Sequence, residues 1–235
     1  MKNLLVAQSG GPTSAINATL AGVVENALSS PSVDRIYGSI NGIQGVLTEN
    51  LIDLKTKITN VSELDLLCQT PASALGSCRV KLKDPAVCAD EYETIISVLR
   101  KYNIDCFIYI GGNDSMDTVD KLSKYLNTKG ITDITVVGAP KTIDNDLCGT
   151  DHCPGFGSAA KYIGTTFAEL ERDCYVYATK AVTIVEVMGR DAGWLTAASC
   201  LARANGAKGP DFIYLCEVPF SIDTFLKDVK AKLEE

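Results

Sequence analysis

The sequence predicts an α/β fold in which a parallel sheet is covered by helices. Short apolar runs of five or six residues alternate along the chain with longer segments whose apolar residues recur at helical spacing. Several of these runs end in glycines or polar residues that open the next helix, as strand-to-helix turns of such sheets do. No internal repeat and no low-complexity linker interrupts the alternation.

Each element rests on its own stretch of pattern. Six runs read as buried strands, and six segments have the periodicity of amphipathic helices. The last helix has Ser221 as its expected N-cap and carries an apolar stripe that needs a partner surface. In chain order, the expected strands are Leu4–Gln8, Arg35–Ser39, Asp105–Ile110, Ile134–Ala139, Val182–Val187 and Asp211–Cys216, and the expected helices are Ser14–Leu28, Glu91–Tyr102, Ser115–Asn127, Ser158–Arg172, Ala192–Arg203 and Ile222 onward.

Composition excludes several classes of function. With 235 residues, 46% of them hydrophobic, the chain suffices for one large domain or two small ones. A net charge of −7 argues against nucleic acid or an anionic membrane as the partner, so an anionic ligand needs local donors. No run approaches the ~18 apolar residues of a membrane span. The N-terminus leads straight into the first strand without a signal peptide, so we expect a cytoplasmic protein.

The cysteines do not indicate a metal or disulfide framework. The chain has nine cysteines and one histidine, with no C-x-x-C pair. An odd number of cysteines without a signal peptide favours reduced thiols, and no spacing supports a zinc site.

The segment Pro140–Asp146, Pro-Lys-Thr-Ile-Asp-Asn-Asp, directly follows the predicted strand Ile134–Ala139. Ligands of open α/β sheets bind beyond the carboxyl ends of strands, so its polar side chains are delivered to that edge. There a lysine such as Lys141 neutralises phosphate, while one of the carboxylates of Asp144 and Asp146 takes a proton and the other faces a metal. The segment therefore predicts a magnesium-assisted reaction of a phosphate.

Two glycine-bearing turns lie at other strand ends. Gly10 and Gly11 follow the first predicted strand, and the segment 111–115, Gly-Gly-Asn-Asp-Ser, follows the third. Backbone amides of such turns, and the helix N-terminus behind them, favour an anion. An ordinary tight turn at the first position, and a simple N-cap at Asp114 or Ser115 at the second, remain alternatives.

Three further positions carry candidate contacts. Arg79 follows the small residues Gly-Ser-Cys and is a candidate phosphate clamp, although a lone arginine is usually a surface residue. Arg190 follows Met188 and Gly189 at a strand-to-helix junction and suits an anion, whereas a methionine there is most often core. Glu217 follows the last predicted strand, where a solvated loop glutamate is the alternative. Together these strand ends indicate a phosphoryl-transfer cleft.

Taken in order, these motifs resemble those of the phosphofructokinase family along essentially the whole chain. The resemblance implies an α/β protein with two Rossmann-like lobes, each a parallel sheet flanked by helices, with the second lobe incomplete. We place the lobes at residues 1–147 and 148–235, because the Gly-, Pro- and Cys-bearing stretch Leu147–Pro154 follows the acidic motif. Family members continue past Glu217 and bring further groups that grip the sugar 6-phosphate.

The resemblance also implies residue roles. Asp144 looks like the general base that takes the proton from the sugar 1-hydroxyl, acting with Arg190, Lys141 and Asp114. The implied donor contacts are Gly10, Gly11, Arg79, Gly112, Asn113 and Ser115; the implied sugar-phosphate contacts are Thr142, Ile143, Asp144, Met188, Gly189, Arg190 and Glu217; and the implied magnesium-facing groups are Asn113, Asp114 and Asp146.

Two positions bear on the phosphoryl donor. ATP-using members resemble Gly-Gly-Asp-Gly-Ser and Pro-Gly-Thr-Ile-Asp-Asn-Asp, whereas this chain has Asp114 and Lys141 in place of the variable glycines. A carboxylate where the α-phosphate would lie repels a nucleotide, and the lysine supplies charge for a small, highly anionic donor. Both changes resemble the pyrophosphate-dependent subgroup.

Two departures from the family pattern accompany them. Asn113 stands where aspartate is usual, and an amide oxygen can still ligate magnesium. Ala181, next to Lys180, stands where many members carry an arginine that reaches a neighbouring subunit.

The expected function is transfer of a phosphoryl group from diphosphate to fructose 6-phosphate, giving fructose 1,6-bisphosphate in glycolysis with Mg²⁺ as cofactor. The alternatives are an ATP-dependent 6-phosphofructokinase and a non-catalytic phosphate-binding or assembly fragment of the same family. We expect a homo-oligomer, as is usual for the family, with no nucleic-acid or membrane partner.

Overall fold

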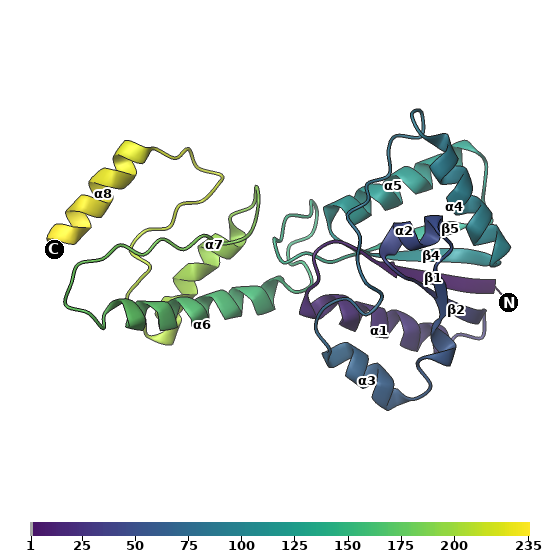
Figure 1. Ribbon diagram of the computed structural model, residues 1–235, viewed down its shortest axis with the longest axis horizontal. Helices are drawn as coiled ribbons and strands as arrows, with labels where there is room; N and C mark the ends of the chain where they lie inside the picture. The colour runs from purple at the N-terminus through teal and green to yellow at the C-terminus, as the bar shows by residue number, and fades with distance from the viewer. Residues whose placement is uncertain (1) are drawn as a thin grey trace. The chain divides into compact units, whose positions relative to one another are not determined.

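The computed structural model describes residues 2–235, which form two compact units (Figure 1). One unit ends at Thr142 and the other spans Ile143–Glu235. Each unit is described by itself below.

The first unit is built on a five-stranded sheet with the order β3-β2-β1-β4-β5. Strands β1, β2, β4 and β5 are parallel to their neighbours, and the short β3 is antiparallel to β2. The four strands predicted for this unit are confirmed, whereas β3 was missed because three residues carry too little pattern. The strands are β1 Lys2–Gln8, β2 Val33–Ser39, β3 Leu51–Asp53, β4 Ile104–Gly111 and β5 Thr135–Pro140.

Helices cover both faces of this sheet. Helices α1 and α3 lie on one face, and α2, α4 and α5 lie on the other (Figure 1). The predictions of α1, α4 and α5 are confirmed to within two residues, while the short α2 and the largely exposed α3 were missed. The helices are α1 Ser14–Ser29, α2 Gly42–Leu47, α3 Val61–Gln69, α4 Ala89–Lys101 and α5 Asn113–Thr128, with a 3₁₀ turn at Leu54–Thr56.

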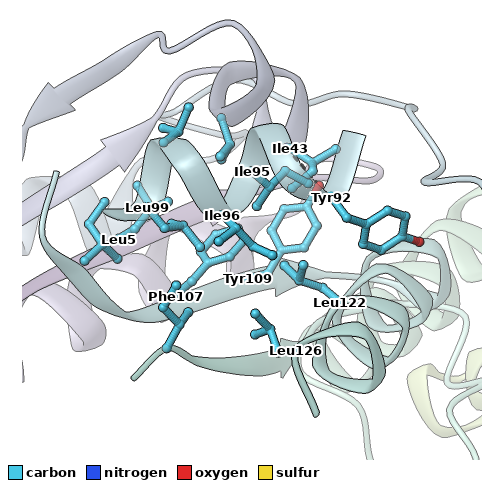
Figure 2. Close-up of a cluster of buried hydrophobic side chains, with 14 of the residues drawn as sticks. Leu5, Ile43, Tyr92, Ile95, Ile96, Leu99, Phe107, Tyr109, Leu122 and Leu126 are labelled. Atoms are coloured by element: carbon cyan, nitrogen blue, oxygen red, sulfur yellow. Dashed lines mark hydrogen bonds between the residues drawn. The ribbon is translucent and has the colours of Figure 1, made fainter. Parts of the chain in front are cut away.

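The core of the first unit has one layer on each face of the sheet. Along β1, Leu5 packs into the layer under α4 and α5, while Leu4 and Val6 pack into the layer against α1. Figure 2 shows the first layer, in which Phe107 and Tyr109 of β4 lie beneath α4. Burial on both faces explains why these strands read as continuous apolar runs rather than as alternating ones.

Replacing Phe107 by alanine is expected to lower the free energy of unfolding by about 3–5 kcal/mol, because a fully buried ring leaves a cavity. Phe107 is 0% exposed, and its ring centroid lies 5.5 Å from that of Tyr109. Urea unfolding followed by circular dichroism measures the loss. The matched control is Val137→Ala on the sheet edge, where the side chain is 44% exposed. Equal losses in the two variants would contradict the placement of Phe107 in the core.

The second unit is helical. Helix α6 packs against α7 and the 3₁₀ segment that follows it. Gly164 permits this approach, since a Cβ atom there would lie 2.9 Å from the Cβ of Leu201. The predicted cap of the last helix is confirmed, because the Ser221 hydroxyl accepts a hydrogen bond from the Thr224 N–H at 3.3 Å. The elements are α6 Phe156–Cys174, α7 Trp194–Ala198, the 3₁₀ segment Ser199–Asn205 and α8 Ile222–Glu234.

An aromatic cluster holds α8 to the rest of its unit. The ring of Phe225 lies 5.7 Å from that of Tyr214 and 5.9 Å from that of Phe220. Part of the predicted apolar stripe thereby has its partner surface, while Ile222 and Leu226 stay exposed.

Two strand predictions in the second unit are wrong. Neither Val182–Val187 nor Asp211–Cys216 forms a strand, and no strand occurs among residues 143–235. Their apolar composition is that of strands, but a strand also needs a neighbouring strand to pair its backbone groups. The predicted helix Ala192–Arg203 is correct only in part, because α7 gives way to a 3₁₀ segment at Ser199.

Candidate functional site

The strand ends of the first unit lie at one level. In the parallel register Gln8 pairs with Ile110, and Gly111 pairs with Pro140. The chain therefore leaves β1, β4 and β5 at the same edge of the sheet, and the three segments that follow these strands meet there.

Direct contacts join the three segments. The Lys141 N–H donates to the Gly111 carbonyl at 2.8 Å, and the Lys141 ammonium donates to the Gly11 carbonyl. The hydroxyls of Ser9 and Ser115 lie 2.5 Å apart. The structure thus brings together predicted donor-site residues from all three strand ends.

The glycines of these loops have specific reasons to be glycine. Gly10 has a φ of +81°, a left-handed conformation that favours glycine. At Gly111 a Cβ atom would lie 2.0 Å from the Ser115 hydroxyl oxygen and 2.9 Å from the Ser9 carbonyl oxygen, so no side chain fits. The two loops therefore approach each other through bare backbone.

Lys141 is the buried cation of this edge. Lys141 is only 3% exposed, and its ammonium donates a hydrogen bond to the Gly11 carbonyl. Because burying an ammonium group is costly without such partners, the hydrogen bond fixes the charge where the loops meet. A Cβ atom at Gly10 would lie only 3.9 Å from the Lys141 ammonium nitrogen, which shows how close this charge comes to the glycine loop.

Two buried polar residues that the sequence analysis missed support the edge. The Gln8 side-chain oxygen accepts from the Ser73 hydroxyl at 3.0 Å and from the Leu75 N–H at 2.9 Å. The Asn17 side-chain oxygen accepts from the Gln8 amide at 3.1 Å and from the Ala74 N–H at 2.8 Å. These bonds tie residues 73–75 to β1 and α1. A glutamine closing an apolar strand, with an asparagine in the following helix, was the available signal.

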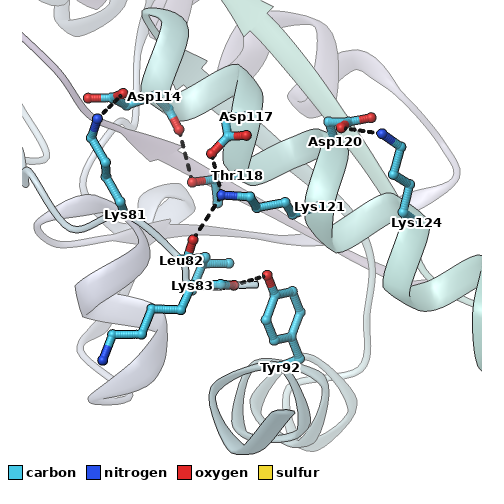
Figure 3. A network of polar contacts seen from close by, with 10 residues as sticks. All are labelled: Lys81, Leu82, Lys83, Tyr92, Asp114, Asp117, Thr118, Asp120, Lys121 and Lys124. Carbon is cyan, nitrogen blue, oxygen red and sulfur yellow. Dashed lines mark hydrogen bonds and ion pairs between the residues drawn. The ribbon is translucent and has the colours of Figure 1, made fainter. Parts of the chain in front are cut away.

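The segment that contains residues 73–75 continues past Arg79, which is exposed. Before it, the Ser77 hydroxyl donates to the Gly10 carbonyl at 2.5 Å. After it, Lys81 forms an ion pair of 2.8 Å with Asp114 (Figure 3). The side chains of Ser77 and Lys81, on either side of Arg79, therefore link this segment to the Gly10 loop and to the first turn of α5.

Asp114 lies in the first turn of α5 and is not its N-cap, which is Gly112. Its side chain is 49% exposed and pairs with Lys81. A carboxylate in this turn is favourable to the helix, whose N-terminus carries partial positive charge.

The acidic motif crosses from the first unit into the second. Thr142 is buried, and Asp144 and Asp146 are half-buried. Between the two carboxylates, the Asn145 side chain accepts from the Cys153 N–H at 2.8 Å and donates to the Asp151 carbonyl at 3.2 Å. The amide of Asn145 therefore fixes the backbone from which the two acids project.

The second unit contains a cavity of about 680 Å³ between the segment that ends at Arg190 and the segment that carries Glu217. Gly189, Arg190 and Glu217 all line it. The structure thus brings together three predicted sugar-phosphate contacts, while the Met188 side chain is 69% exposed and is not part of the lining.

The carboxylate of Glu217 has fixed donors. The Gly193 N–H donates to it at 2.6 Å, and chiefly for this reason the pKa of Glu217 is lowered. The group is therefore ionised at neutral pH and acts as a hydrogen-bond acceptor at the cavity wall.

Lys180, the residue next to the expected arginine position, has a partner within its own unit. Its ammonium donates to the Leu233 carbonyl in the last turn of α8. This contact places a cation at the negative end of a helix, where it is favourable.

The predicted metal-facing residues are divided between the two units. Asn113 and Asp114 start α5, whereas Asp146 belongs to the second unit. Within residues 2–235 no group of three or more histidine, cysteine, aspartate or glutamate side chains is arranged to hold a metal ion. The oxygen donors of these three residues are nevertheless of the kind that Mg²⁺ prefers.

A mostly parallel sheet with glycine loops and a buried lysine at its carboxyl edge defines the class: an α/β protein whose strand ends are arranged as those of phosphate-binding proteins are. The family model described as phosphofructokinase matches residues 3–235. The chain belongs to the phosphofructokinase family, and the resemblance read from its motifs is confirmed. Enzymes of this family generally use a divalent metal ion. In residues 2–235 no helix is long and apolar enough to cross a membrane.

The chain is similar to two curated relatives and to a solved structure of this family. Pyrophosphate–fructose 6-phosphate 1-phosphotransferase of Xanthomonas campestris is 44% identical over 99% of this chain and 55% of its own length. ATP-dependent 6-phosphofructokinase of Histophilus somni is 32% identical over 99% of this chain and 65% of its own. The crystal structure of pyrophosphate-dependent phosphofructokinase from Marinobacter aquaeolei has a TM-score of 0.86 and 41% identity, and the match covers 100% of this chain and 58% of that one. The chain spans about half the length of the pyrophosphate-dependent relatives it matches.

Proposed function

We propose that this protein transfers a phosphoryl group from diphosphate to the 1-hydroxyl of fructose 6-phosphate, giving phosphate and fructose 1,6-bisphosphate. The observation that carries the proposal is the buried Lys141 ammonium on the Gly11 carbonyl, at the strand edge that also presents Asp114. A site of this kind would hold the phosphates of the donor by a fixed positive charge, without contacts to a nucleoside. Relatives 41–44% identical bear the pyrophosphate name, whereas the ATP-dependent ones are 30–32% identical, and both facts support diphosphate as donor.

In this proposal the first unit binds the donor. The backbone amides of the two glycine loops face the phosphates, and the ammonium of Lys141 and the guanidinium of Arg79 neutralise them. Catalysis then consists mainly of positioning and of electrostatic stabilisation of the transferring phosphoryl group. The donor-binding residues proposed are Gly10, Gly11, Arg79, Gly112, Asn113, Ser115 and Lys141.

The acceptor sugar would be bound by the acidic motif and the second unit. Asp144 takes the proton from the 1-hydroxyl while the oxygen of that hydroxyl attacks phosphorus. The bond from that phosphorus to the bridging oxygen of diphosphate breaks, and phosphate is released. Arg190 balances the transferring charge, and Glu217 accepts a sugar hydroxyl. The sugar-phosphate contacts proposed are Thr142, Ile143, Asp144, Met188, Gly189, Arg190 and Glu217.

The divalent metal is proposed to be Mg²⁺. The donor set fits it, because Asn113, Asp114 and Asp146 offer only oxygen ligands, and a hard cation with several bound waters needs few protein groups. Bound Mg²⁺ would neutralise charge on the phosphates. We further propose that the protein acts in the cytoplasm as a homo-oligomer.

The test is formation of fructose 1,6-bisphosphate from fructose 6-phosphate and Mg²⁺, with diphosphate and ATP supplied in parallel reactions. Turnover with diphosphate and none with ATP is the expected result. Turnover with ATP alone would establish an ATP-dependent kinase instead. Diphosphate binding without turnover would identify a non-catalytic phosphate-binding protein.

A further inference from the structure

The donor edge contains a cation that the sequence analysis did not single out. Lys81 pairs with Asp114 at 2.8 Å across 33 residues of sequence, and the side chains are 66% and 49% exposed (Figure 3). Lys81 therefore links the segment that carries Arg79 to the first turn of α5.

The backbone around Lys81 is held independently of this ion pair. The Lys121 ammonium donates to the Leu82 carbonyl at 3.1 Å, and the Tyr92 hydroxyl donates to the Lys83 carbonyl at 2.6 Å (Figure 3). Loss of the Lys81 charge would thus leave the segment attached, so that its electrostatic effect can be measured separately.

The charge of Asp114 poses a problem for the proposed donor. Asp114 lies only two positions after Gly112 of the glycine loop, and diphosphate carries several negative charges. An uncompensated carboxylate there would repel every polyphosphate, diphosphate included. A cation in contact with the carboxylate removes most of this repulsion at the distance of the donor.

We propose that Lys81 is the positioning residue that makes Asp114 compatible with diphosphate. Its ammonium cancels the carboxylate charge and directs the carboxylate toward residues 79–83. Lys81 acts through Asp114 and does not itself touch the donor. This inference rests on the proposed function, since it takes diphosphate as the ligand.

Lys83 offers a matched control on the same segment. Within residues 2–235 no ion pair joins Lys83 to an acidic side chain at 4.0 Å or less, and its side chain leads away from Asp114 in Figure 3. Lys81→Met and Lys83→Met remove the same charge from the same strip of chain.

The experiment is calorimetric titration of the full chain with diphosphate in the absence of Mg²⁺, so that the proposed metal contact of Asp114 does not enter the comparison. Lys81→Met is expected to raise Kd about tenfold, and Lys83→Met by less than about twofold. Adding Asp114→Asn to Lys81→Met is expected to bring Kd back to within about threefold of the unmodified protein, and Lys81→Arg should keep the original affinity. The effect of Lys81→Met should shrink at high ionic strength.

Three results would overturn the inference, and they are distinguishable. If Lys81→Met binds diphosphate normally, Lys81 has no role in donor binding. If Lys81→Met binds weakly and adding Asp114→Asn does not restore affinity, Lys81 does not act through Asp114. It would then contact the donor directly or support the fold. If the unmodified protein does not bind diphosphate even when Mg²⁺ is added, the proposed function fails together with the inference.

Discussion

Replacement of Asp144 by asparagine is expected to lower turnover of fructose 6-phosphate by roughly 10²–10⁴-fold, the usual contribution of a general base. Asparagine keeps the size of the side chain and removes its capacity to take a proton. Diphosphate affinity should be little changed, because the donor contacts proposed lie on the glycine loops and Lys141. Initial rates and calorimetric Kd values together separate the two effects.

Asp151 provides the control for this substitution. It lies in the same acidic segment, is exposed, and contributes its backbone carbonyl rather than its carboxylate to the Asn145 hydrogen bond. Asp151→Asn should therefore turn over normally. Near-normal turnover of Asp144→Asn would remove Asp144 from the role of base.

Replacing Asp114 and Lys141 together by glycine is expected to change the donor preference. Diphosphate turnover should fall by about 10²-fold, because the buried ammonium on the Gly11 carbonyl is lost with its charge. ATP binding should become measurable, because the Asp114 side chain no longer occupies the place where the α-phosphate of the nucleotide would lie. Competition between diphosphate and ATP in the turnover assay measures both changes.

The charge-matched control is Asp120→Ala with Lys124→Ala, an exposed ion pair of 2.7 Å on the same helix, α5. This double variant removes the same two charges away from the glycine loops. Its donor preference should stay unchanged. If the Asp114 and Lys141 double variant bound ATP no better than this control variant does, the two residues would not determine the donor.

Much of the donor edge could be predicted because its information is local. The runs before Ser9 and Gly112 are buried on both faces and the run before Lys141 is also apolar, so all three read as strands, and the order of strands and helices then brings their ends to one edge. The second unit shows the limit of this reasoning. Its segments at 182–187 and 211–216 have strand composition, but pairing depends on neighbours that composition does not specify.

The contacts that cross long stretches of sequence could not be predicted. Lys81 meets Asp114, and Gln8 meets Ser73 and Leu75, across separations at which no periodicity operates. Glu217 was predicted as a residue that follows a strand; the strand does not form, and the residue lines the cavity of the second unit.

The buried hydrogen bonds of Gln8 have a consequence for the dynamics of the donor edge. A surface segment such as 73–77 would ordinarily open on its own, faster than the sheet beneath it. Here its opening exposes the Gln8 and Asn17 amides, which lose several hydrogen bonds at once. The segment therefore belongs to the same cooperative unit as the end of β1, and its amides should exchange with deuterium as slowly as those of the strand. A phosphoryl donor that binds as proposed would meet a surface that is already ordered, so its binding free energy would be little reduced by the cost of ordering that surface.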